Sequence, residues 1–169
     1  MLDRAKFGIT AMILVILPTL VACSPGALCM PLLDAINQDN VDVVRDHIES
    51  DTDLNKMFIW TGREFAGASA LHLAVSLEHK EIAELLLNNG ANINIRARDQ
   101  YGGTPLHWAA FLGHKQMAEM LVEAGADINV LDKTGNTPLD AVMSNPDLDP
   151  KIKTDIEDYL RKNGAKTKN

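Results

Sequence analysis

The hydrophobic and polar positions of the chain divide it into two zones. No charged residue lies between Lys6 and Asp34, and the stretch from Phe7 to Ala22 is a run of 16 apolar, small or weakly polar residues. In the second zone, apolar positions within residues 82–86 and 117–121 are spaced i, i+3 and i+4. That spacing predicts amphipathic helices that each bury one face.

The second zone repeats itself with a period of about 35 residues. The segment Ser69-Ala70-Leu71-His72 recurs as Thr104-Pro105-Leu106-His107 and as Thr137-Pro138-Leu139-Asp140, at spacings of 35 and 33. Positions further along each unit keep the offset of 35, namely His79 and His114, Gly90 and Gly125, and Asn94 and Asn129. Self-similarity of this kind indicates a stack of one supersecondary unit.

Local turn chemistry predicts what each unit contains. Thr followed by Pro begins a helix, because the hydroxyl caps unpaired backbone amides and a proline at the first helical position needs no N–H. Gly113 is expected to end the first helix of its unit. Gly90, Gly125 and Gly164 stand where the second helix needs a left-handed residue to end it. Each unit is therefore predicted to be a helix, a turn, a second helix and a loop.

These motifs resemble the ankyrin-repeat family. The segment from Gly103 to Gly135 follows the family pattern at Thr104, Pro105, Leu106, His107, Ala109, Ala110, Gly113, His114, Gly125, Ala126, Asp127, Asn129, Asp132 and Gly135. The resemblance covers nearly all of residues 31–167. It implies an all-α fold, a solenoid of about four helix-turn-helix units with loop or hairpin fingers.

The repeat motifs, together with the apolar zone at the start, divide the chain into segments. We predict a signal peptide over 1–22, a lipidated tether over 23–30, a degenerate N-terminal unit with a long loop over 31–66, repeats over 67–101 and 102–134, and a C-terminal capping unit over 135–169. Terminal units of a stack differ from the others because they present a polar face to water. The capping unit carries an extra segment, Asn145 to Pro150, before a final helix predicted over 151–163. Ser69-Ala70 and Glu78 depart from the pattern, and Glu78 should slightly weaken the first helix of its unit.

The resemblance also assigns the histidines a structural role. In the family, the histidine at His72 and His107 hydrogen-bonds within and between repeats, and the one at His79 and His114 begins the second helix. No cysteine lies nearby and one such residue per repeat does not converge on an ion, so no metal site is expected. The chain has no Gly-x-Ser-x-Gly elbow, phosphate loop or HExxH helix. We therefore expect no catalytic residue, no cofactor and no enzymatic activity.

The apolar zone at the start of the chain is similar to a bacterial lipoprotein signal peptide. Its 16-residue run is shorter than the roughly 20 residues of a spanning helix. The run follows Arg4 and Lys6, as in secretory signals. Leu20-Val21-Ala22-Cys23 resembles the lipobox, which implies that Cys23 becomes an acylated N-terminus.

This resemblance implies a bacterial envelope protein that faces the periplasm and touches the membrane through its lipid anchor alone. By the family's sorting rule, Ser24 favours the outer membrane. Two alternatives stay open. One is an ordinary signal peptide cut near Ala22, which would give a secreted protein, and the other is an uncleaved inner-membrane anchor running to about Cys29. In either compartment Cys29 is expected to be a buried small residue.

A solenoid binds partners through its concave face and the loops on one edge. In the family, the variable concave positions end each first helix, and here they are Asn37/Gln38, Ser76/Leu77 and Phe111/Leu112. The loop from Asn55 to Gly67 is six residues longer than the standard one and includes Met57, Phe58, Ile59 and Trp60. The next loop adds Arg96, Arg98 and Tyr101, which are common interface residues. Residues 57–60 could form a partner contact or fold back as a satellite core.

Composition and charge narrow the class of partner. The chain has 16 Lys+Arg and 23 Asp+Glu in 169 residues. Removing the signal peptide takes away Asp3, Arg4 and Lys6, which leaves 14 basic and 22 acidic residues, a net charge of −8. That balance disfavours nucleic acid and favours a basic protein partner by electrostatic steering.

We expect a monomeric, non-catalytic binding module that holds a protein against the membrane. One specific version is a neutralising partner of a toxin or enzyme, with the acidic surface masking a basic site. The other class is a structural or stress-protective envelope component without a dedicated client. Fold alone does not choose between them.

Overall fold

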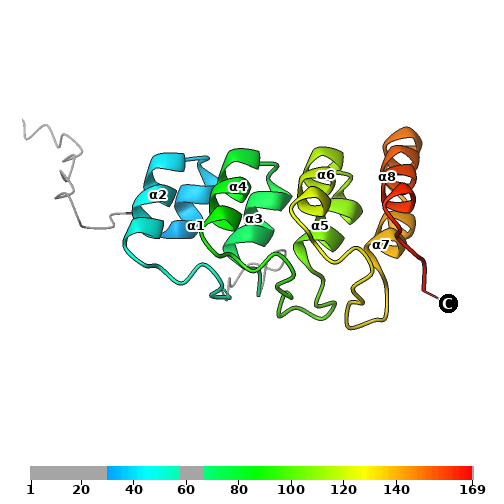
Figure 1. Cartoon of the computed structure of the whole chain (residues 1–169), viewed down its shortest axis with the longest axis horizontal. Coiled ribbons are helices and arrows are strands. Elements are labelled where there is room, and N and C mark those ends of the chain that lie inside the picture. Colours follow the sequence, from blue (N-terminus) through cyan, green and yellow to red (C-terminus); the bar gives the residue numbers. More distant parts are fainter. Residues whose placement is uncertain (1–29, 58–66, 169) are drawn as a thin grey trace, which may run out of the picture.

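The computed structural model describes residues 30–57 and 67–168. Within them the chain forms eight helices and no strand, paired as four hairpins that lie side by side in one row (Figure 1). The helices are α1 (Leu32–Asn37), α2 (Val41–Glu49), α3 (Ala70–Ser76), α4 (Lys80–Asn88), α5 (Pro105–Leu112), α6 (Lys115–Glu123), α7 (Pro138–Ser144) and α8 (Pro150–Lys162). The predicted all-α helix-turn-helix solenoid is confirmed.

The helices make two layers. The first helices of successive units, α1, α3, α5 and α7, contact one another in that order. In the second layer, α2 contacts α4 and α6 contacts α8. The segments that leave the second helices lie together along one side of the row, at the bottom of Figure 1. We call this side the loop edge.

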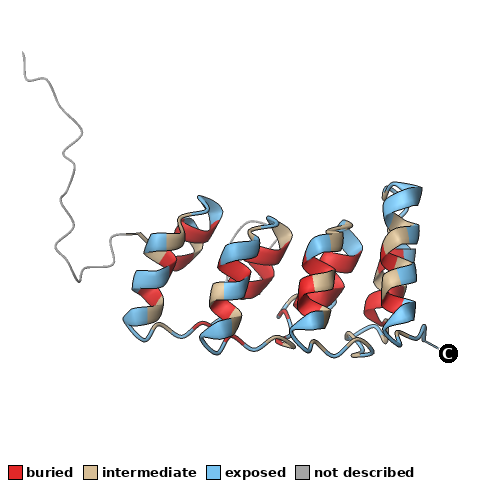
Figure 2. Cartoon of the chain, turned by 45° about the horizontal axis from the view of Figure 1, so that its top comes forward, coloured by how far each residue is buried: buried red, intermediate tan, exposed pale blue. Residues whose placement is uncertain are grey.

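The core runs continuously between the two layers. Figure 2 shows buried positions concentrated in the first helices and on the faces of the second helices turned toward them. Burying an apolar side chain of this size stabilises the fold by about 1.5–3 kcal/mol. The largest fully buried apolar side chains are Ile36, Val44, Leu71, Ile82, Leu86, Leu106, Met117, Leu121, Leu139, Ile156 and Leu160.

The first helices begin where the Ser/Thr motifs predict. Ser69, Thr104 and Thr137 each precede a helix and form a capping box with the side chain three residues later. The N–H of Thr137, for example, donates to Asp140 Oδ2 at 2.9 Å. Pro105 and Pro138 occupy first helical positions, where their missing N–H leaves no hydrogen bond unmade.

An asparagine in each loop joins its unit to the next one. Asn55 Oδ1 accepts from the backbone N–H of Asn92 at 2.7 Å, and Asn94 Oδ1 accepts from that of Asp127 at 2.9 Å. The backbone N–H of Lys166 donates to Asn129 Oδ1 at 2.8 Å. The loop edge is therefore hydrogen-bonded from unit to unit, in addition to the apolar stacking of the helices.

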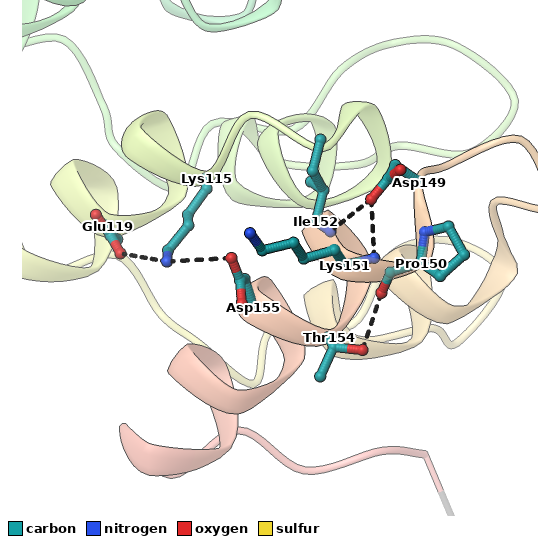
Figure 3. A network of polar contacts seen from close by, with 8 residues as sticks. All are labelled: Lys115, Glu119, Asp149, Pro150, Lys151, Ile152, Thr154 and Asp155. Carbon is teal, nitrogen blue, oxygen red and sulfur yellow. Dashed lines mark hydrogen bonds and ion pairs between the residues drawn. The ribbon is translucent and has the colours of Figure 1, made fainter.

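The final helix follows the extra segment and packs directly against α6 of the unit before it. It begins one residue earlier than predicted, at Pro150, because Asp149 Oδ1 accepts from the backbone N–H of Lys151 and Ile152 at 2.8 and 3.2 Å (Figure 3). Lys115 Nζ lies 3.9 Å from Glu119 Oε1 within α6, and across the junction it lies 3.7 Å from Asp155 Oδ2 of α8. Both ion pairs are solvent-exposed, so each contributes under about 1 kcal/mol.

Candidate partner-binding surfaces

Exposed apolar side chains gather at the carboxyl ends of the first helices. Leu77 follows α3, Phe111 and Leu112 end α5, and Met143 lies near the end of α7. Phe111 is 44% exposed and is the only phenylalanine among the exposed large apolar residues of the described chain. The helices α3, α5 and α7 pack against one another in that order, so these four residues follow one another along the stack. We call them the apolar row.

The sequence predicted three members of this row but not Met143. The last motif follows the preceding one at a spacing of 33 residues, so Met143 aligns with buried Ala110 and not with exposed Phe111. Ile152 was also missed, and it is exposed in the first turn of α8 beside Gly113. A search of the C-terminal unit for apolar residues on polar helix faces would have found both.

The predicted loop residues divide between described and undescribed parts of the chain. Arg96 and Arg98 are exposed on either side of buried Ala97, whose backbone N–H donates to Gly103 O at 2.9 Å. Tyr101 is 57% exposed. Met57 is half-buried, whereas Phe58, Ile59 and Trp60 lie outside the described residues. Whether residues 57–60 form a contact or a core stays a prediction.

The first histidine of each inner unit links two units through buried hydrogen bonds. His72 Nε2 donates to Gly103 O at 3.1 Å, and Nδ1 accepts from Ser69 Oγ at 2.9 Å. His107 makes the same bonds to Asn136 O (3.0 Å) and Thr104 Oγ1 (2.9 Å). Burial lowers the pKa of His72 to about 4 although the bond to Gly103 opposes it. Burial likewise lowers the pKa of His107, so both rings are neutral at pH 7.

The second histidine of each inner unit contacts a carboxylate of the unit before it. His114 Nδ1 lies 3.0 Å from Glu78 Oε1, and His114 Nε2 donates to Ser76 O at 3.1 Å. His79 Nδ1 lies 3.3 Å from Asp39 Oδ1. Asp39 and Glu78 both have positive φ, 52° and 59°, at the turn between their two helices. The sequence did not predict these pairs.

Trp108 packs against the same buried network. Its ring meets that of His72 edge-on, with centroids 4.9 Å apart, so it joins the third unit to the second. This arrangement agrees with a packing role rather than a free binding side chain.

Comparison with known families decides the identity of the fold. A family model for ankyrin repeats (three copies) matches residues 32–132. The chain belongs to the ankyrin-repeat family. No curated protein matches it significantly. As an ankyrin-repeat chain it is a protein-interaction module, and the surfaces described above are where this member can differ from others.

The fourth ankyrin unit lies beyond the matched range and is built differently. Asp140 stands where the inner units have His72 and His107. Instead of reaching a following unit, Asp140 Oδ2 accepts from Thr137 and from the backbone N–H of Lys168, each at 2.9 Å. Partial burial acts to raise the pKa of Asp140, but these hydrogen bonds outweigh it and lower the pKa.

Charge is distributed unevenly along the ankyrin stack. Residues 30–57 carry seven acidic and two basic side chains, a net charge of −5, and all seven carboxylates are exposed. Within the described residues only Asp39 among them makes an ion pair, with His79. The acidic residues are Asp34, Asp39, Asp42, Asp46, Glu49, Asp51 and Asp53.

The described residues offer no metal centre. No group of three or more His, Cys, Asp or Glu side chains in residues 30–57 and 67–168 could hold an ion. In the same part of the chain, none of the helices has both the length and the hydropathy to cross a membrane. Cys23, Ser24, Cys29 and the predicted signal peptide lie outside the described residues.

Proposed function

We propose that the protein is a non-catalytic module that binds a protein partner through the apolar row, Leu77, Phe111, Leu112 and Met143. The observation that carries this proposal is a large aromatic side chain left 44% exposed beside exposed Leu112, at the end of a helix that packs against both neighbouring units. Aromatic anchors of this kind supply most of the energy of protein interfaces. The helices beneath the row are held by a continuous core, so little ordering is needed on binding.

Substitution of Phe111 tests the proposal. A partner is first isolated by cross-linking and stoichiometric co-purification with the wild-type chain, and its Kd is then measured for Phe111→Ala. We expect Kd to rise at least tenfold, as for a hot-spot residue contributing about 2 kcal/mol. The thermal midpoint should change little, because Phe111 is not part of the core.

Leu131→Ala is the matched control, because Leu131 is an equally exposed apolar residue on a loop. It should leave Kd within about twofold of wild type. Equal affinity for wild type and Phe111→Ala would exclude the apolar row as the binding surface.

We also propose that the module is tethered to a bacterial envelope membrane through acylated Cys23, facing the periplasm, with Ser24 favouring the outer membrane. The support is the lipobox-like sequence after an apolar run. Two or three acyl chains would hold the protein firmly, since each buried methylene contributes about 0.8 kcal/mol. Intact mass of the membrane fraction should show cleavage before Cys23 and an acyl mass that Cys23→Ala abolishes. Cleavage without acylation would indicate a secreted protein, and an uncleaved chain would indicate a signal anchor.

The charge of the first unit favours one specific kind of client. Seven exposed carboxylates against two cations would steer a basic protein to this end of the stack, as in a neutralising partner of a toxin or enzyme. The association rate with the isolated partner should fall as salt rises, and Asp42→Asn with Asp46→Asn should reduce that dependence. Asp155→Asn, in the fourth unit, is the control. An association rate that is independent of salt would exclude a basic client at the first unit. It would not bear on the proposal that the apolar row binds a partner.

A further inference from the structure

A row of cations runs along the loop edge, in contrast to the acidic first unit. Arg98 and Lys133 occupy the same position in two successive units, 35 residues apart, and Lys168 continues the row at the fourth unit. Their backbone N–H groups donate to the preceding structure, Arg98 to Gly67 O at 2.9 Å, Lys133 to Tyr101 O at 2.8 Å and Lys168 to Asp140 Oδ2 at 2.9 Å. These backbone hydrogen bonds therefore fix the position from which each cationic side chain extends.

The carboxylates beside these cations are engaged by backbone amides. Asp99 Oδ1 accepts from the N–H of Tyr101 at 3.0 Å and of Gly102 at 2.5 Å, and Asp132 Oδ1 accepts from Thr134 and Asn136 at 2.7 and 2.9 Å. These bonds lower the pKa of Asp132 even though partial burial acts to raise it. Asp99 and Asp132 thus shape the loops, whereas Asp140 feels the charge of Lys168, which helps to lower the pKa of Asp140.

The cations keep most of their hydrogen-bonding capacity. Lys133 Nζ donates to Asp99 O at 2.6 Å and Lys168 Nζ to Asn136 Oδ1 at 2.5 Å, so each ammonium retains two N–H groups. Within the described part of the chain, none of Arg98, Lys133 and Lys168 lies in an ion pair. Exposed Tyr101 lies beside the row and offers an apolar surface.

We propose that this row binds an acidic, extended segment of a protein partner along the loop edge. The inference rests on the proposed function and adds the chemistry of a second contact surface. Arginine pairs with a carboxylate through two parallel N–H groups, and lysine satisfies a carboxylate as a point charge. An anionic membrane is less favoured, because a flat anionic surface would also meet the −5 charge of residues 30–57.

The spacing of the row predicts the spacing of the acidic residues. Adjacent helices pack about 8–10 Å apart, and an extended chain advances about 3.3 Å per residue. One cation per unit therefore matches one carboxylate at about every third residue of the bound segment. A segment with its acidic residues side by side could engage only one unit at a time.

Two labelled peptides of about twelve residues test the proposal against the full chain. One has Glu at every third position among Ser and Thr, and the other has the same composition with its Glu residues consecutive. We expect tighter binding of the spaced peptide by fluorescence anisotropy. Arg98→Gln, Lys133→Gln and Lys168→Gln should each weaken it about two- to fivefold, and the triple variant about tenfold or more. Added salt should weaken wild-type binding.

Lys151→Gln is the matched control, because Lys151 is an exposed lysine in the first turn of α8, away from the loop edge (Figure 3). Equal affinity for both peptides, or equal loss in the control, would overturn the proposal. So would binding to phosphatidylglycerol vesicles but not to either peptide. Phe111→Ala should leave peptide binding unchanged, so a failure of the apolar row and a failure of the loop edge can be told apart. Circular dichroism of the triple variant confirms that it folds.

Discussion

The second and third units place different residues at the same left-handed turn. Glu78 has φ 59° between α3 and α4, and Gly113 has φ 82° between α5 and α6. At Glu78 the side chain contributes a carboxylate to His114 of the next unit. At Gly113 an added Cβ would lie 2.3 Å from Leu148 Cδ1, so a side chain there would require Leu148 to move. One backbone conformation is thus reached by two residue types.

The difference shows that contacts with the following unit determine which residue type is favoured at this turn. A non-glycine residue with positive φ costs about 1–2 kcal/mol, which the second unit partly offsets by its bond to the third. The third unit faces the extra segment of the C-terminal cap instead, and the methyl group of Leu148 fills the space beside Gly113. Glycine at this turn is therefore a packing requirement in one unit and dispensable in another.

Among the changes that test this comparison, Gly113→Ala is expected to have the largest effect on stability. Left-handed strain and overlap with Leu148 should together lower the free energy of unfolding by roughly 2–5 kcal/mol. Urea denaturation would measure it. Gly125→Ala is the control, because Gly125 has φ 92° with nothing within 4 Å of an added Cβ. It should cost only the backbone strain, and equal losses at both sites would show that Leu148 exerts no steric constraint.

The next largest effect is expected from acid, which should lower the stability of the second and third units through the buried histidine that each contains. The unfolded state binds a proton at His72 below its ordinary pKa of 6.5, whereas the folded state does not until about pH 4. Stability from this group is therefore complete above pH 6.5 and falls by about 1.4 kcal/mol per pH unit down to about pH 4, a loss of about 3 kcal/mol. His107 adds a loss of the same sign.

Urea midpoints between pH 8 and pH 4 would test this dependence. His72→Gln should flatten the curve more than His107→Gln, because His72 is the more deeply buried ring. A midpoint that stays constant from pH 6.5 to 4 would contradict the neutral, buried state assigned to His72.

The smallest effect concerns the bond between Glu78 and His114. A double-mutant cycle with Glu78→Gln and His114→Gln should give a coupling of about 0.5 kcal/mol, because the carboxylate is exposed. Glu78→Gly removes the same bond but also the strain of positive φ, so it should be less destabilising than Glu78→Gln. If Glu78→Gly were the more destabilising of the two, the positive φ of Glu78 would carry no strain that glycine relieves, and the comparison with Gly113 would need revision.

The sequence predicted the architecture well because its signals are local. Thr followed by Pro placed the starts of α5 and α7, and Asp149 before Pro150 placed the final helix to within one residue. The carboxylate-histidine pairs were not predicted because their partners lie 40 and 36 positions apart, and the departure of Glu78 from the repeat pattern does not by itself indicate a partner. The cation row was not predicted, although Arg98, Lys133 and Lys168 follow the 35-residue period of the repeats. The binding roles of the apolar row and of residues 57–60 stay predictions.

The bonds between Glu78 and the following histidine bear on how such a chain can grow. A second copy of residues 67–101 placed directly after the first would present His79 to Glu78 of the original, in the way that His114 does now. His72 would find a backbone carbonyl where it now meets Gly103 O, and Asn94 would find a backbone N–H where it now meets Asp127. The molecule therefore already contains a module that tandem duplication could lengthen, one 35-residue step at a time.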